Sequence, residues 1–174
     1  MRRHILLIGL PGSGKSTAGW LAARMLDAPF VDPDVDVERR AGRTIPEIFA
    51  AGGEAEFRRL EREAVRRALD GAPAVVAPGG GWGAAADALD EARERGALAV
   101  YLRCTPGEAV RRLGDCGNRP LLSDAADPAT RMSELLAARE SRYLAADHTV
   151  DTDGHTPDRV AREVVALAHR HGGW

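Results

Sequence analysis

The residues that decide the fold are 4–17, HILLIGLPGSGKST, near the start of the 174-residue chain. His4–Ile8 is a short aliphatic run typical of a buried strand, and Gly9–Ser16 matches the phosphate-loop pattern G-x-x-x-x-G-K-[ST]. The glycines let backbone N–H groups curl around phosphate oxygens, and a helix that begins after the loop points its positive end at the anion. A strand, this loop and a helix in succession predict an α/β fold with a phosphate site.

This loop also contains the only lysine of the chain, Lys15, although lysine and arginine together number 24. Lysine is a compact point charge on a flexible stem, which suits the β- and γ-phosphates of ATP. The hydroxyl of Ser16 suits Mg²⁺. The residues expected to bind ATP here are Gly12, Ser13, Gly14, Lys15, Ser16 and Thr17. The alternative is a glycine turn that only joins a strand to a helix.

Short apolar runs alternate with longer helical patterns along the rest of the chain. This alternation predicts one α/β domain over residues 1–174, with about five parallel strands covered by helices on both faces. Capping boxes, Thr44 with Glu47 and Thr105 with Glu108, indicate two helix starts. Beyond His4–Ile8, strands are expected at 30–31, 74–77, 97–103 and 148–150, and helices at 15–26, 34–41, 46–51, 53–69, 84–95, 106–113, 128–145 and 157–171.

Composition narrows the class of protein. A formal net charge of -2 implies no general attraction to nucleic acid or to a membrane surface. The N-terminal apolar run is too short, and too soon followed by polar glycine residues, for a signal peptide. Two cysteines, Cys104 and Cys116, fit a reduced cytoplasm and no zinc pattern. We therefore expect a cytoplasmic protein with small-molecule partners, and a monomer is the simplest expectation.

Two carboxylates follow the second expected strand, in the sequence VDPDVD. Ligands of parallel sheets bind at the carboxyl ends of the strands, where Asp32 and Asp34 lie. Asp32 could hold Mg²⁺ through water, and Asp34 could orient or deprotonate a substrate hydroxyl. The alternative is a helix N-cap, for which aspartate is well suited. Asp36 fits a structural role better.

Two further segments allow both a functional and a structural interpretation. Gly79–Gly81 ends the third expected strand, where it could expose N–H groups to an oxygen-rich ligand or simply turn the chain. Arg119 lies in a Gly-, Asp- and Pro-rich stretch at 114–127, which we expect to be a lid loop. A loop arginine can stabilise transferred charge and exclude water, or it can be an ordinary exposed arginine.

Taken together, these motifs resemble the shikimate kinase family from about Ile8 to about Pro157. The stretch 42–61 is the most specific of them. The resemblance implies a three-layer P-loop NTPase fold with a five-stranded parallel sheet, a substrate-binding region at about 33–62 and the lid at about 114–127. The matching segments, in family order, are GLPGSGKSTAG, FVDPD, GRTIPEIFAAGGEAEFRRLE, GGG, VYLRCTP, RPLL, RESRY and VDT.

The same resemblance implies transfer of the ATP γ-phosphate to the 3-hydroxyl of shikimate with Mg²⁺. Arg58 and Arg139 would grip the acid's carboxylate, for which a planar guanidinium is the natural partner. Glu61, three residues after Arg58 on one helix, would hold that arginine. The implied catalytic residues are Lys15, Asp34 and Arg119, and the implied substrate-binding residues are Asp34, Phe49, Phe57, Arg58, Gly79, Gly80, Gly81 and Arg139. ATP would be bound by Arg112, Arg119 and Pro157, with adenine between Arg112 and Pro157. The metal would be held by Ser16 and, through water, by Asp32.

The sequence departs from the family pattern at three positions. Trp20 stands where arginine is common, Trp82 follows the triple glycine where a small residue is usual, and His155 replaces a basic residue near the adenine. Trp82 could pack under the loop or reshape the acceptor pocket. Two alternatives therefore stay open: a kinase for another cyclitol acid or a gluconate-like polyol, and a nucleotide-binding protein without catalysis.

Overall fold

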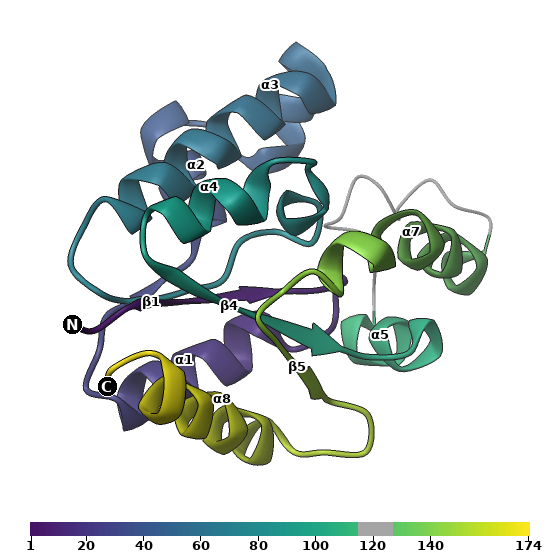
Figure 1. Ribbon diagram of the computed structural model, residues 1–174. Coiled ribbons are helices and arrows are strands. Elements are labelled where there is room, and N and C mark those ends of the chain that lie inside the picture. The colour runs from purple at the N-terminus through teal and green to yellow at the C-terminus, as the bar shows by residue number, and fades with distance from the viewer. Residues whose placement is uncertain (115–126) are drawn as a thin grey trace.

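The computed structural model describes residues 1–114 and 127–174. Its described part contains a five-stranded parallel sheet with the strand order β2-β3-β1-β4-β5. Figure 1 labels β1, β4 and β5 of this sheet. β1 is central and pairs with β4 along its whole length, from His4 opposite Ala97 to Ile8 opposite Tyr101. The strands are β1 (His4–Ile8), β2 (Phe30–Val31), β3 (Val75–Val76), β4 (Ala97–Arg103) and β5 (His148–Asp151).

Helices cover both faces of the sheet because successive residues of β1 point to opposite sides. Ile5 and Leu7 pack in one buried cluster with α1 and α8, whereas Leu6 and Ile8 pack in another with α3, α4, α5 and α7. In Figure 1, α1 and α8 lie on one side of the sheet, and α3 and α4 lie on the other. This confirms the α/β class and the layers expected from the sequence. The helices are α1 (Lys15–Met25), α2 (Pro33–Ala41), α3 (Ile45–Leu69), α4 (Ala88–Glu94), α5 (Pro106–Leu113), α7 (Pro128–Tyr143) and α8 (Pro157–His171).

α2 and the first half of α3 form a smaller unit with its own apolar cluster, which includes Val37, Ile48 and Phe57. The capping box at Thr44 has both of its hydrogen bonds. The two helices expected at 46–51 and 53–69 are merged into α3, with a kink at Gly53, whose φ of 71° and ψ of -175° are not helical. Glycine adopts this conformation without the penalty of a side chain.

Two local expectations are met only in part. The helix expected at 84–95 is instead a short 3₁₀ turn, η1 (Trp82–Ala84), followed by α4, because the chain after β3 is fixed by packing against β1 rather than by helix propensity. The capping box expected at Thr105 is only half formed. The Glu108 carboxylate pairs with Arg111 and Arg112 instead, each through a hydrogen bond of 2.7 Å.

The expected lid, including Arg119, lies almost wholly outside the described residues. Within residues 1–114 and 127–174, no helix combines the length and the apolar character that a membrane span requires.

Candidate active site

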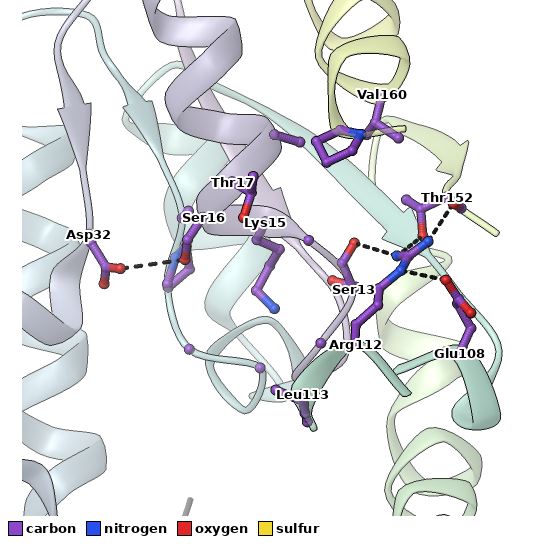
Figure 2. Close-up of a pocket in the computed structure, with 18 of the residues that line it drawn as sticks. Ser13, Lys15, Ser16, Thr17, Asp32, Glu108, Arg112, Leu113, Thr152 and Val160 are labelled. Atoms are coloured by element: carbon purple, nitrogen blue, oxygen red, sulfur yellow. Dashed lines mark hydrogen bonds and ion pairs between the residues drawn. The ribbon is translucent and has the colours of Figure 1, made fainter. Parts of the chain in front are cut away.

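A cavity of about 470 Å³ opens at the carboxyl ends of β1, β2 and β3 (Figure 2). The phosphate loop forms its floor, and the two aspartates that follow β2 flank it. This is the edge of a parallel sheet where ligands bind. Among the residues that line the cavity are Gly12–Thr17, Asp32, Asp34, Gly79, Gly80, Arg112, Thr152, His155 and Pro157.

The phosphate loop depends on glycine at two places. Gly12 has a φ of 79°, and a Cβ there would lie 2.3 Å from the carbonyl oxygen of Ala109. Gly14, with a φ of 91°, is the N-cap of α1. Because α1 begins at Lys15, the N–H groups of its first turn and the positive end of its dipole face the cavity. The loop is therefore an anion site made largely of backbone.

Lys15 is held inside this loop. Its side chain is buried, and Nζ donates hydrogen bonds to the carbonyl oxygens of Gly9 (2.9 Å) and Leu10 (2.8 Å). Figure 2 shows the side chain extending from the first turn of α1. The carbonyl contacts fix a positive point charge beside the backbone N–H groups that would receive a phosphate.

Ser16 and Asp32 meet across the mouth of the cavity. The Ser16 hydroxyl lies 3.5 Å from Oδ2 of Asp32 (Figure 2), and Oδ1 of Asp32 accepts a hydrogen bond from the backbone N–H of Asp34. Asp32 is thus the N-cap of α2 as well, so its two interpretations are compatible. Burial raises the pKa of Asp32 despite these hydrogen bonds.

The donor set fits a hard divalent cation that shares phosphate and water ligands. One hydroxyl and one carboxylate supply oxygen ligands beside the anion site. The described residues contain no cluster of three His, Cys, Asp or Glu side chains suited to hold a metal by themselves. A cation here would therefore depend on the nucleotide for most of its ligands.

Two carboxyl groups converge on Gly79. A Cβ on this glycine would lie 2.6 Å from Oε1 of Glu61 and 3.5 Å from both carboxylate oxygens of Asp34. Glu61 is fully buried, and burial raises its pKa to about 7, although Arg58 opposes the shift. The nearby charge of Asp34 raises the pKa of Glu61 further. The absence of a side chain at Gly79 is what lets these two groups approach one another.

Two arginines from distant helices reach the same triple-glycine segment, Gly79–Gly81. Nη1 of Arg58 donates to Oε2 of Glu61 at 2.6 Å, and the guanidinium lies where a Cβ on Gly81 would be, 2.2 Å away. Nη1 of Arg139 donates to the carbonyl oxygen of Gly80 at 3.3 Å. The structure thus brings Arg58 of α3 and Arg139 of α7 to one loop, and neither arginine is among the residues that line the phosphate cavity.

The expected apolar wall consists of two rings in contact. Phe49 and Phe57 lie with their centroids 5.0 Å apart and an interplanar angle of 36°. Phe57 is buried, and the guanidinium of Arg58 lies 5.2 Å from its ring centroid. The wall and Arg58 therefore belong to the same part of α3.

Arg112 and Pro157 line the far end of the cavity together. Arg112 is held by Thr152, through the backbone oxygen at 2.6 Å and the hydroxyl at 2.9 Å, and by Glu108 at 2.7 Å (Figure 2). Neither Thr152 nor Glu108 was predicted from the sequence as a site residue. The available signals were the position of Thr152 directly after β5 and the i,i+4 spacing of Glu108 and Arg112.

The unusual tryptophans lie away from the cavity. Trp82 is 5% exposed and packs in the core cluster that contains Leu6 and Ile8, so it lies under the loop. Trp20 is 47% exposed on α1, where the guanidinium of Arg24 lies 5.0 Å from its ring centroid. His155 lines the cavity beside Pro157.

A phosphate loop at the end of the central strand of a parallel sheet, with a serine and an aspartate beside it, defines a P-loop phosphotransferase. A family model described as shikimate kinase matches residues 11–168. The shikimate kinase of Salinispora arenicola is 47% identical, over 93% of this chain and 95% of that protein. The chain therefore belongs to the shikimate kinase family.

Solved structures agree. A shikimate kinase from Acinetobacter baumannii in complex with shikimate superposes with a TM-score of 0.91 at 30% identity, covering 98% of this chain and 94% of that one. A gluconokinase from Sinorhizobium meliloti superposes with a TM-score of 0.68 at 19% identity, covering 99% and 94% of the two chains, which shows a shared fold alone.

Proposed function

We propose that this protein transfers the γ-phosphate of ATP to the 3-hydroxyl of shikimate. The observation that supports this most strongly is the convergence of Arg58, Arg139 and Asp34 on the triple-glycine segment beside the phosphate loop. Two guanidinium groups suit a carboxylate, and one aspartate suits a neighbouring hydroxyl. A polyol without a carboxylate would offer neither arginine an anionic group on the substrate.

On the donor side, ATP would lie along the cavity with its phosphates in the loop Gly12–Thr17. Adenine would lie between Arg112 and Pro157. Mg²⁺, held by Ser16 and through water by Asp32, would neutralise phosphate charge when bound. Lys15, fixed by two loop carbonyls, would place its ammonium against the β- and γ-phosphates.

On the acceptor side, Arg58 and Arg139 would bind the carboxylate while Phe49 and Phe57 face the ring. Asp34 would orient the hydroxyl for in-line attack and accept its proton. Glu61 would act through Arg58 by fixing its guanidinium.

The remaining expectations extend this proposal. Arg119, on a lid at about 114–127, would stabilise the transferred charge, and residues 33–62 would form the acceptor region of a single domain over 1–174. The protein would act as a cytoplasmic monomer, without nucleic-acid or membrane partners.

The test is release of ADP by purified protein supplied with Mg-ATP and shikimate, gluconate or no acceptor. Strong release with shikimate alone is the expected result. Equal release with gluconate, an open-chain acid that also carries a carboxylate, would contradict selectivity for the ring of shikimate. If the protein binds ATP but releases no ADP with any acceptor, the result would favour a non-catalytic nucleotide-binding protein.

A further inference from the structure

One side chain outside the expected site contacts the triple-glycine segment directly. The hydroxyl of Tyr143, at the end of α7, donates a hydrogen bond to the carbonyl oxygen of Gly80. Tyr143 is completely buried, and its ring packs on Tyr101 with centroids 5.2 Å apart. It lies four residues after Arg139, so both side chains leave the same face of α7.

Gly80 is therefore held from two sides. On one side its carbonyl oxygen receives Tyr143 and, at 3.3 Å, Arg139. On the other side a Cβ would lie 2.6 Å from Cδ of Pro11 in the phosphate loop, so the backbone packs directly on that loop. Arg142 adds a third contact from α7, to the carbonyl oxygen of Ala84 just after the segment. The acceptor loop is thus fixed between α7 and the ATP site.

This inference rests on the proposed function, under which the two donors to the Gly80 carbonyl, Arg139 and Tyr143, behave differently when shikimate binds. Arg139 would turn toward the carboxylate of shikimate. The carbonyl of Gly80, a buried residue, still needs a donor at that moment, because an unpaired buried carbonyl is costly. Tyr143 remains in place to supply it.

We infer that Tyr143 is a positioning residue whose hydroxyl donates to the Gly80 carbonyl. Arg139 can then leave this carbonyl to bind the acceptor's carboxylate, while the triple-glycine segment keeps its position against the phosphate loop. Without that hydroxyl, Arg139 is the only remaining donor to this carbonyl within the described residues. Binding the acid then breaks a hydrogen bond that nothing replaces.

The chain offers a matched control. Tyr101 is as fully buried as Tyr143 and belongs to the same ring pair, but its hydroxyl has no hydrogen-bond partner in the described structure. Tyr143→Phe and Tyr101→Phe therefore each remove one buried hydroxyl and keep the ring. They differ in whether a hydrogen bond to Gly80 is lost.

We expect Tyr143→Phe to raise the shikimate KM about fivefold, the effect of one buried hydrogen bond, with the ATP KM unchanged. Tyr101→Phe should leave both constants as they are. In an Arg139→Ala background the effect of Tyr143→Phe should largely disappear, because the two residues act through one carbonyl. A wild-type shikimate KM in Tyr143→Phe, an equal loss for ATP, or the same effect in Tyr101→Phe would overturn the inference.

Amide hydrogen exchange tests, in the absence of any acceptor, whether Tyr143 stabilises the triple-glycine segment. The amides of Trp82 and Ala84 bond to the carbonyls of Gly79 and Gly81 and report on this turn. Their exchange should quicken in Tyr143→Phe but stay near that of the wild type in Arg139→Ala, where the hydroxyl remains. Unchanged exchange in the first variant, or an equal rise in the second, would refute the positioning role. If the wild type binds no shikimate, the proposed function fails, and this measurement still decides the role of Tyr143.

Discussion

Replacing Glu61 by glutamine should raise stability at alkaline pH and weaken acceptor binding at the same time. Glu61 is fully buried, and burial raises its pKa from an ordinary value of 4.5 to about 7. The folded protein therefore binds this proton more tightly than the unfolded chain does. The stabilisation is complete below pH 4.5, and it is lost as the pH rises through 7, because the folded state must then hold a buried charge.

The gap between the two pKa values corresponds to roughly 3 kcal/mol of unfolding free energy. Glutamine has the same shape and does not titrate. The free energy of unfolding of Glu61→Gln, minus that of the wild type, should therefore rise by roughly 2–3 kcal/mol between pH 5 and pH 8. Denaturant unfolding of both proteins across this range measures it. A flat difference would refute the assignment of the raised pKa to burial.

The functional half of the prediction concerns Arg58. Glutamine removes the charged partner that holds Nη1 at 2.6 Å, while the exposed partner Glu54 remains. We expect the shikimate KM to rise and the ATP KM to stay unchanged. Glu54→Gln is the control: this side chain is 51% exposed, so its replacement should change stability by at most about 0.5 kcal/mol. An unchanged shikimate KM in Glu61→Gln would contradict its role beside Arg58.

Three further replacements test other parts of the site. Lys15→Ala should nearly abolish ADP release in a folded protein, since it removes the charge fixed inside the phosphate loop; near-normal turnover would contradict that role. Arg58→Ala should sharply raise the shikimate KM and leave ATP binding, measured by calorimetry, nearly intact; an equal loss of ATP affinity would count against the carboxylate grip. Gly79→Ala places a Cβ 2.6 Å from Glu61 and should destabilise the fold by about 1–3 kcal/mol, whereas Gly107→Ala, with open space around it, should not; similar melting temperatures for both variants would contradict the packing argument.

Much of the fold could be predicted from the sequence because its signals are local. The aliphatic run His4–Ile8, the glycine loop after it and the alternation of apolar segments indicated a parallel sheet with helices on both faces. The strand at Ala97–Arg103 and the helix at Pro106–Leu113 have their expected bounds. The segment after β3 was the exception, since it is shaped by the packing of Trp82 and Gly83 against the core.

The site divides in the same way. The phosphate loop is a contiguous motif whose chemistry depends on backbone geometry, so its residues could be named from their order alone. The position of Asp32 in the sequence allowed two interpretations, a helix cap and a site residue. In the structure its carboxylate both caps α2 and contacts the Ser16 hydroxyl. Only the spatial neighbours of Asp32, which the sequence does not show, decide whether it caps the helix, contacts Ser16 or does both.

The class of fold, the phosphate-loop motif and the family follow from the order of the residues, because they rest on residue types at fixed spacing along the chain. Tertiary structure alone decided which distant groups meet. It brought α3 and α7 to one glycine segment, placed the Glu61 carboxyl where burial raises its pKa, and gave the hydroxyl of Tyr143, but not that of Tyr101, a partner. Burial and hydrogen bonding between residues far apart in sequence depend on how the layers pack, and no local pattern records that.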